Sequence, residues 1–231
     1  MEKIIVLEIK YQYEGKEECL YPVVLKDEKN MVLIDCGYPG FLPLIEQEMT
    51  AKGLDVSQLT HILITHHDHD HMGAAFEIVN KYPQIKFVSS VVEEPYISGR
   101  RKSLRLEQAE RMQEGLTEEQ RQFGNQFCEI LRAVKTVEVD ITAHDGEIMD
   151  WCGGCTILDT SGHTQGHISV YLNQHKIMIT GDAAVVENEA LVVANPHFAY
   201  DLKKAEEALH KIISYEAEEF ICYHGGIWRQ S

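Results

Sequence analysis

Four histidines and two aspartates form one unbroken run at residues 66–71, directly after a short apolar segment. Zn²⁺, iron and Mn²⁺ all bind imidazole and carboxylate groups in proteins. A sharp turn between the preceding strand and the following helix can direct alternate side chains to one point. His66 and Asp68 would then face one metal ion, and Asp70 and His71 a second. A histidine-rich surface loop is the alternative, but a run of six potential ligands favours a metal site.

Three further segments carry a potential ligand directly after a predicted strand, and one loop alone cannot close a metal site. The ligands are His163, Asp182 and His224. Each has a glycine beside it, at positions 162, 181 and 225, which permits close approach of the backbone. Each segment taken singly indicates little, but together and in this order they strengthen the prediction of a metal centre.

The run at residues 66–71 resembles the metal-binding loop of the metallo-β-lactamase fold superfamily, a superfamily of metal hydrolases. The usual loop is His-x-His-x-Asp-His after a threonine, and here it is His-His-Asp-His-Asp-His after Thr65. Asp68 therefore stands in the place of the second histidine, while His67 and His69 occupy the variable positions. Position 68 is where this chain leaves the usual pattern.

Four further segments match the superfamily in the expected order along the chain. They are the early Asp-x-Gly turn at residues 33–37, the Gly-His-Thr-x-Gly segment at 161–167 with Ser161 in place of proline, the bridging aspartate at 180–182 and the final histidine at 224–225. The resemblance covers residues 31–225 and implies an α/β fold, a four-layer αββα sandwich with a helical insertion. Because this fold hosts many reactions, the resemblance does not define the substrate.

The resemblance also implies a ligand set for two divalent metal ions. One ion would be bound by His66, Asp68 and His163, the other by Asp70, His71 and His224, with Asp182 as the bridge. We expect zinc. Iron and manganese are the alternatives, because a carboxylate at position 68 is harder than imidazole and adds negative charge. The alternative at this position is that His69 swings in as the ligand. Asp35 is expected to orient a ligand imidazole through a hydrogen bond, unless it serves only the turn.

Two bound cations would lower the pKa of a water molecule towards neutrality, and the resulting hydroxide would attack a carbonyl carbon or phosphorus. Asp70 is the expected catalytic residue, which orients this water or accepts its proton. His69, His197 and Tyr200 are candidate substrate contacts. The predicted function is a metal-dependent hydrolase that cleaves an ester-like bond, in a thioester, lactone, carboxylic ester or phosphoester. The alternatives are a β-lactam hydrolase, a two-iron oxidoreductase and a non-catalytic metal-binding sensor.

The chain of 231 residues is predicted to form one metallo-β-lactamase-like domain over residues 1–231, with a helical insertion at about residues 93–134. Apolar runs predict strands at residues 4–9, 21–25, 31–34, 61–65, 86–89, 136–139, 156–159, 168–171, 177–180 and 220–223. Helical spacing predicts helices near residues 41–49 and 73–80, and one after Asp201 with an apolar face of Leu202, Ala205, Leu209, Ile212 and Ile213. The insertion carries an apolar stripe typical of core packing, and a lid over the site is the alternative.

The formal net charge is −16, from 21 Lys and Arg and 37 Asp and Glu. Such a field repels phosphate backbones, so nucleic acid is not an expected partner. A basic cluster at Arg100, Arg101, Lys102 and Arg105 is interpreted as the solvated start of a helix. We expect a small-molecule substrate, and a homodimer formed through the apolar helical insert stays open.

No apolar run approaches the roughly 18 residues that a membrane-spanning helix needs, and no signal sequence is recognised near the N-terminus. We therefore expect a cytoplasmic protein with no membrane partner. Its six cysteines are then expected to be reduced. Cys152 and Cys155 enclose two glycines, which favour a hairpin turn over a thioredoxin-type redox motif.

Overall fold

The computed structural model describes residues 2–13 and 15–229, except for the side chains of residues 119, 120 and 123. Within these ranges, one six-stranded sheet has the order β1-β4-β5-β6-β7-β8. Its strands are β1 (Lys3–Val6), β4 (Val23–Lys26), β5 (Met31–Ile34), β6 (His61–Leu63), β7 (Lys86–Ser90) and β8 (Ile141–Ala143). The first three strands pair antiparallel, and the pairs from β5 to β8 are parallel.

A second six-stranded sheet has the order β16-β15-β12-β11-β10-β9. Its strands are β9 (Ile148–Met149), β10 (Cys155–Asp159), β11 (Ile168–Leu172), β12 (Ile177–Gly181), β15 (Glu219–Cys222) and β16 (Gly226–Arg229). Only the β12–β15 pair in this described sheet is parallel. Two separate hairpins complete the strands: β2 (Ile9–Tyr13) with β3 (Lys16–Leu20), and β13 (Val185–Glu187) with β14 (Ala190–Val192).

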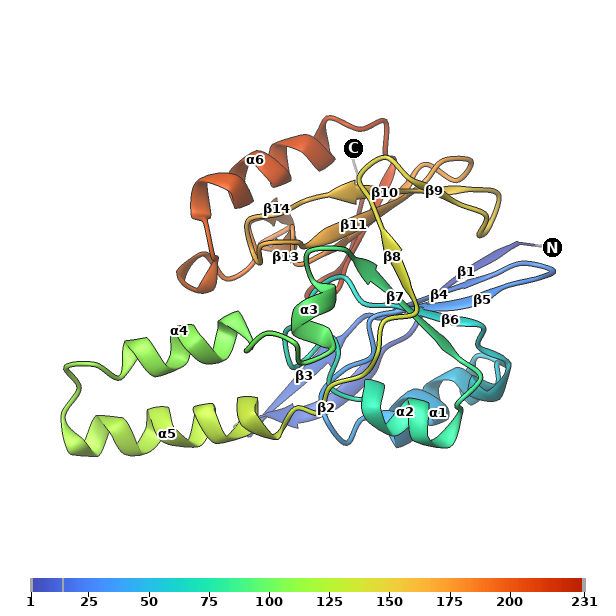
Figure 1. Cartoon of the computed structure of the whole chain (residues 1–231). Coiled ribbons are helices and arrows are strands. Elements are labelled where there is room, and N and C mark those ends of the chain that lie inside the picture. The colour runs from blue at the N-terminus through green and yellow to red at the C-terminus, as the bar shows by residue number, and fades with distance from the viewer. Residues whose placement is uncertain (1, 14, 230–231) are drawn as a thin grey trace.

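The two sheets pack face to face, with helices on both outer faces (Figure 1). Leu63 and Val88 of the first sheet share a buried cluster with Val170 and Ile221 of the second. Because successive strand residues point to opposite faces, the neighbouring apolar residues of the first sheet pack against helices instead. The helices on that side are α1 (Leu42–Ala51) and α2 (Ala75–Lys81), and the helix on the other side is α6 (Leu202–Ile213). The predicted four-layer αββα sandwich is confirmed.

Helix α6 begins where the sequence predicted, after Asp201, whose side chain accepts a hydrogen bond from the backbone N of Lys204 at 3.1 Å. Such an N-terminal cap satisfies a backbone donor that the helix itself leaves free. The buried face differs from the predicted one, because Ala208 lies in it and Leu202 is 44% exposed. The short connection before the helix contains η2 (Pro196–Phe198). A similar short turn, η1 (Val56–Gln58), follows α1.

Residues 94–133 contain three helices, α3 (Glu94–Ile97), α4 (Leu104–Met112) and α5 (Glu118–Ala133). Helices α4 and α5 form a hairpin that extends away from the sandwich (Figure 1). A small buried cluster holds the two helices together, made of Leu106, Ala109, Cys128 and Leu131. Helix α4 starts at Ser103, whose hydroxyl accepts a hydrogen bond from the backbone N of Leu106 at 3.3 Å.

Two strand predictions were wrong. Residues 136–139 form no strand, and β8 begins at Ile141 because the register of β7 pairs Val88 with Ile141. The backbone N of Val137 instead donates to the carbonyl of Ile97 at 3.1 Å. The strand predicted at 4–9 is divided between β1 and β2, and β2 turns away from the sheet to pair with β3.

The predicted turn at residues 152–155 lies between β9 and β10, which pair antiparallel at Met149 and Cys155. Both cysteines are free and buried. Burial raises the pKa of the Cys155 thiol to about 12, so this thiol stays protonated at neutral pH. None of the helices in the described part of the chain has the length and apolar character needed to cross a membrane.

Candidate metal centre

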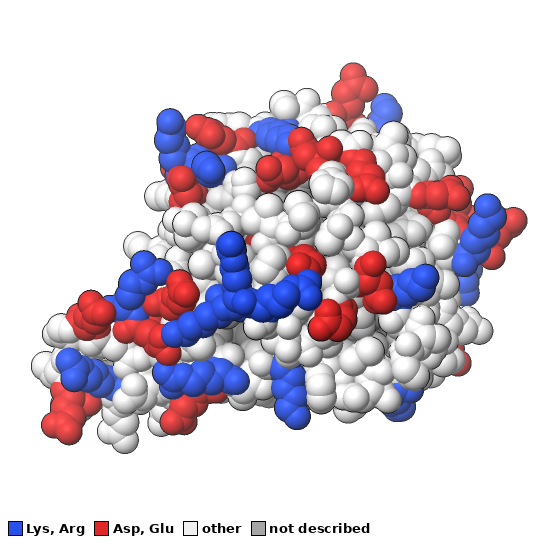
Figure 2. Space-filling model, in the orientation of Figure 1, with Lys and Arg blue, Asp and Glu red and all other residues white. Residues whose placement is uncertain are grey.

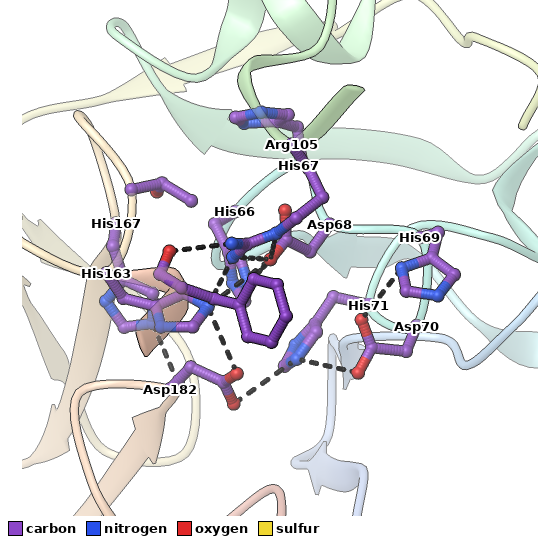
Figure 3. A network of polar contacts seen from close by, with 12 residues as sticks. His66, His67, Asp68, His69, Asp70, His71, Arg105, His163, His167 and Asp182 are labelled. Atoms are coloured by element: carbon purple, nitrogen blue, oxygen red, sulfur yellow. Dashed lines mark hydrogen bonds and ion pairs between the residues drawn. The ribbon is translucent and has the colours of Figure 1, made fainter. Parts of the chain in front are cut away.

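The candidate ligands come from four segments that follow strands of both sheets. The run at residues 66–71 follows β6, and His163 lies between β10 and β11. Asp182 follows β12 directly, and His224 lies between β15 and β16. Figure 3 shows imidazole and carboxylate groups of the first three segments directed towards a common centre. The fold thus brings together residues that are up to 158 positions apart (224 − 66).

Three groups of potential ligand atoms lie close enough to hold a metal ion, with all atoms of each group within 4.8 Å of one another. They are His66, Asp68 and His163; His66, His71 and Asp182; and Asp70, His71 and His224. Several buried atoms at this centre have no hydrogen-bond partner, namely Nε2 of His66, Oδ1 of Asp68, Nε2 of His71 and Oδ1 of Asp182. Because buried polar atoms are almost always paired, such a convergence of unpaired ligand atoms fits a metal centre. The sequence-predicted ligands therefore all meet at one place.

Asp182 lies between the two outer groups. Its Oδ2 is 3.4 Å from Nε2 of His163, while its Oδ1 is 3.3 Å from Nε2 of His71 and 3.6 Å from Nε2 of His224. The two oxygens of one carboxylate thus face different histidine groups. This arrangement is what a carboxylate bridge between two cations requires.

Residues behind the ligands hold their imidazole rings in place. Oδ2 of Asp35 lies 2.8 Å from Nδ1 of His71, and Asp35 also accepts hydrogen bonds from the backbone N and the hydroxyl of Thr65. Asp35 has a φ of 60°, in the left-handed region that aspartate tolerates better than most residues. On the other side, Nε2 of the buried His167 accepts a hydrogen bond from the backbone N of Asp182 at 2.9 Å. Because Asp35 engages Nδ1 of His71, Nε2 is the ring nitrogen that faces the centre.

The carboxylates of the centre favour their charged form. Burial alone would raise the pKa of Asp182, but His71 and His224 hold this pKa well below its usual range. Burial would likewise raise the pKa of Asp70, but His71 and His224 lower it. Conversely, burial alone would lower the pKa of His71, while Asp182 and Asp35 raise it well above its usual range. The centre therefore buries carboxylates in their charged form, and positive charge beside them stabilises that form.

Comparison with known protein families finds one whose sequence model matches most of this chain. A family model described as the metallo-beta-lactamase superfamily matches residues 21–224. The chain belongs to this superfamily. A relative in Bacillus subtilis (strain 168), named "Probable metallo-hydrolase YflN", is 25% identical over 224 residues, which cover 89% of this chain and 80% of the relative. Membership of the metallo-beta-lactamase superfamily supports a hydrolase that uses metal ions.

Solved structures show the same fold. A metallo-beta-lactamase family protein from Thermus thermophilus is 21% identical, with a TM-score of 0.76 over 98% of this chain and 74% of that one. A metallo-beta-lactamase from Pontibacter korlensis is 18% identical, with a TM-score of 0.69 over 99% of this chain and 90% of that one. An archaeal superfamily protein from Sulfolobus tokodaii is 20% identical, with a TM-score of 0.68 over 99% of this chain and 82% of that one.

Arg105 belongs to the centre and not to a solvated basic cluster, so this part of the sequence prediction was wrong. The residue is only 6% exposed, and its Nη2 lies 2.5 Å from Oδ2 of Asp68. The rest of the cluster follows the prediction, because the side chains of Arg100 and Lys102 are 57% and 46% exposed. Figure 2 shows basic side chains on this face with acidic ones beside them. The sequence around Asp68 does not indicate this contact, because Arg105 lies 37 residues further along the chain.

Glu93 is a second residue that sequence reasoning missed. It is fully buried and accepts hydrogen bonds from the backbone N of His67 at 3.0 Å, the hydroxyl of Thr164 at 2.7 Å and the backbone N of Gly166 at 2.8 Å. Its carboxylate also contacts Nδ1 of His67, whose Nε2 accepts a hydrogen bond from the backbone N of Leu104 at 3.2 Å. Glu93 and His67 therefore connect two ligand-bearing loops with the first turn of α4.

A cavity of about 1010 Å³ opens over the centre and reaches between the β2–β3 hairpin and the α4–α5 hairpin. Asp68, Asp70 and Asp182 lie at its base, and its apolar wall includes Tyr11, Tyr38, Ala109, Met112, Leu116, Phe127 and Ile130. His69, a candidate substrate contact, lines the cavity with its ring against those of Tyr38 and Phe127. The cavity joins a polar base to an apolar wall.

The other two candidate contacts from the sequence do not line this cavity. His197 and Tyr200 are both exposed, whereas Asn195 and Phe198 of the same loop face the cavity. The backbone N of Tyr200 donates to the carbonyl of His163 at 3.0 Å. In this structure the loop between Asp182 and α6 therefore meets the cavity through different residues from those predicted.

Proposed function

We propose that this chain is a dinuclear metal hydrolase that cleaves an ester-like bond in a small molecule with an apolar group. The bond would be that of a carboxylic ester, thioester, lactone or phosphoester. The observation that supports two metal positions best is the arrangement of Asp182, whose two oxygens face different histidine groups. The superfamily membership supports hydrolysis as the reaction class.

Two subsites are proposed. The first subsite consists of His66, Asp68 and His163, and the second consists of Asp70, His71 and His224, with Asp182 shared between them. Two cations bound here would lower the pKa of a water molecule and polarise the oxygen of the scissile bond. Zinc is the metal that we propose, because two imidazoles and a carboxylate at each subsite suit it, and the carboxylate of Asp68 makes iron or manganese the alternatives.

The side chains of the centre would divide the remaining work. The carboxylate of Asp70 lies 3.2 Å from Nε2 of His224 and lines the cavity, where it can orient a water molecule or accept its proton. Asp35 fixes the ring of His71 from behind, so that only Nε2 of this ring faces the centre. Phe198 and residues of the α4–α5 hairpin line the cavity beside these groups.

The shape of the cavity favours a substrate with an apolar acyl or alkyl group. Leu116, Phe127 and Ile130 belong to a wall that begins beside the aspartates of the centre. Ile130 is 50% exposed and Met112 is 59% exposed, although both are large apolar side chains whose burial releases free energy. An apolar group of the substrate would cover this wall while the scissile bond lies over the carboxylates.

The experiment that tests this function is a hydrolysis screen with metal-free protein and protein supplied with Zn²⁺, Mn²⁺ or Fe²⁺. The panel contains carboxylic esters, thioesters, lactones, phosphodiesters and β-lactams, each with short and long apolar groups. We expect turnover of an ester-like class that requires added metal and is lost in Asp182→Asn. Turnover that is equal without metal, or turnover of β-lactams alone, would contradict the proposal.

A further inference from the structure

Arg105 enters the first subsite from helix α4. Its Nε and Nη2 lie 3.0 Å and 2.5 Å from Oδ2 of Asp68, and Nη2 also lies 3.2 Å from Nε2 of His163. Oδ2 of Asp68 and Nε2 of His163 are 3.3 Å apart, and both residues belong to the ligand group of the first subsite. The positive guanidinium therefore contacts two side chains that a metal ion would have to bind (Figure 3).

The guanidinium is held in this position by contacts outside the ligand set. Its Nη1 donates to the carbonyl of Phe198 at 2.6 Å and to Oε1 of Gln108 at 2.9 Å. The guanidinium carbon also lies 5.4 Å from the centre of the Phe198 ring. Since both Arg105 and Asp68 are buried, their ion pair is poorly screened by solvent. A metal ion at the first subsite would therefore compete with the guanidinium of Arg105 for Asp68 and His163.

The second subsite has no such competitor among the described residues. Asp70 forms ion pairs there with His69, His71 and His224 only, and Asp182 with His71, His163 and His224 only. An imidazole can lose its proton and bind a metal, whereas a guanidinium stays charged and cannot bind a metal. The two subsites therefore differ in charge, although each offers two imidazoles and a carboxylate.

We infer that Arg105 weakens metal binding at the first subsite, so that the second subsite fills first and the first fills only at higher metal concentration. This inference rests on the proposed dinuclear centre. The guanidinium compensates the extra negative charge that Asp68 introduces where the superfamily pattern has a histidine. Asp68 and Arg105 thus act as a matched pair that makes the two metal positions unequal.

The test is a titration of metal-free protein with Zn²⁺ in the presence of a competing chelator, with bound metal measured by elemental analysis. We expect two binding constants in the wild type, separated by about a hundredfold or more. Arg105→Ala should tighten the weaker constant at least about tenfold, within the range by which residues around a metal site tune its affinity. The stronger constant should be unchanged. Arg111→Ala is the matched control, because Arg111 lies on the same helix with a side chain that is 66% exposed.

Two further variants make the result decisive. Arg105→Gln removes the positive charge but keeps a polar side chain beside Asp68, so it should also tighten the weaker constant, even if Arg105→Ala folds poorly. His224→Ala should weaken Zn²⁺ binding at the tighter of the two sites, which assigns that site to the second subsite. A weaker constant that is unchanged or loosened in both Arg105→Ala and Arg105→Gln would overturn the inference while leaving the dinuclear hydrolase standing. Wild-type protein that binds no Zn²⁺ at saturation would overturn the proposed function itself.

Discussion

The carboxylate of Asp35 and the imidazole of His71 form a buried pair, in which Nδ1 of His71 lies 2.8 Å from Oδ2 of Asp35. Both side chains are almost completely inaccessible to solvent. Because Nδ1 is engaged in this way, Nε2 is the nitrogen that the ring presents to the centre. The pair connects the turn after β5 with the ligand run after β6.

This relationship predicts the behaviour of Asp35→Asn. Asparagine tolerates the left-handed backbone at position 35 but provides a weaker, neutral acceptor for His71. We expect the affinity of the second subsite for Zn²⁺ to fall about 10- to 100-fold. Titration with a competing chelator measures this change. Wild-type affinity in a variant with a normal melting temperature would show that Asp35 serves only the turn.

Asp182→Ala tests the proposed bridge. Removing the carboxylate deprives both subsites of a ligand and leaves the facing imidazoles of His71 and His163 without their partner. We expect kcat/KM for any active substrate to fall at least a hundredfold, about 3 kcal/mol of barrier. Steady-state kinetics at saturating metal checks this, with Asp145→Ala, an exposed aspartate outside the centre, as the control. Retained activity would exclude the bridging role.

Ile130→Ala tests the apolar wall of the cavity. Ile130 is 50% exposed and lines the cavity, so its truncation costs little in folding but removes apolar surface from the proposed substrate site. For substrates with long apolar groups we expect KM to rise about fivefold, roughly 1 kcal/mol, with kcat unchanged. Substrates with short groups should show no change. Ile148→Ala is the control, since Ile148 is 65% exposed and lies on β9 away from the cavity.

A KM that rises equally for short and long substrates would show that Ile130 does not select substrates by the length of their apolar group.

The α4–α5 hairpin supplies Arg105 to the centre and much of the apolar wall to the cavity. We propose that this hairpin selects substrates by their apolar group. Deleting residues 106–131 and joining the ends with a short glycine linker should then remove the preference for long groups.

Glu93→Gln tests the link between the two ligand loops. Burial alone would raise the pKa of Glu93, but His67 and Thr164 hold it below the ordinary value of 4.5. A carboxylate with a lowered pKa stabilises the fold at pH values above its unfolded pKa, and this contribution is lost as the pH falls through its folded pKa. We expect Glu93→Gln to lower the free energy of unfolding by about 2 kcal/mol at pH 7.

The difference from the wild type should be largest at pH values between about 4.5 and 6.5. It should shrink below this range, as Glu93 is protonated, and above it, as His67 loses its proton. Urea unfolding at several pH values with a chelator present measures it without any contribution from metal binding. Glu138→Gln, at a side chain that is 81% exposed, is the control. A difference that keeps growing as the pH falls below about 4.5 would show that Glu93 is protonated in the folded protein.

The sequence predicted the parts of this molecule whose signals are local. The apolar runs of β5, β7, β10, β11 and β12 were found because each strand is largely buried and rich in apolar residues. The hairpin of β2 and β3 was missed because it is mostly polar and exposed, which leaves no apolar run to detect. The ligand run at 66–71 was visible because its residue types are rare together.

Contacts between distant segments were beyond such signals. Arg105 resembles its exposed basic neighbours in sequence, and only the fold shows that α4 carries it to Asp68. Glu93 similarly precedes a short helix and looks like a surface residue, although it is completely buried. Asn195 and Phe198 face the cavity while His197 and Tyr200 do not, because the direction of each side chain depends on the turn at η2.

The central claim is that two metal ions bind at the ligands named here, and anomalous diffraction from crystals grown with saturating Zn²⁺ tests it most directly. We predict two peaks, one within about 2.2 Å of ligand atoms of His66, Asp68 and His163, and one equally close to Asp70, His71 and His224. Both peaks should contact Asp182. The absence of zinc from these residues, or zinc bound only elsewhere, would contradict the account.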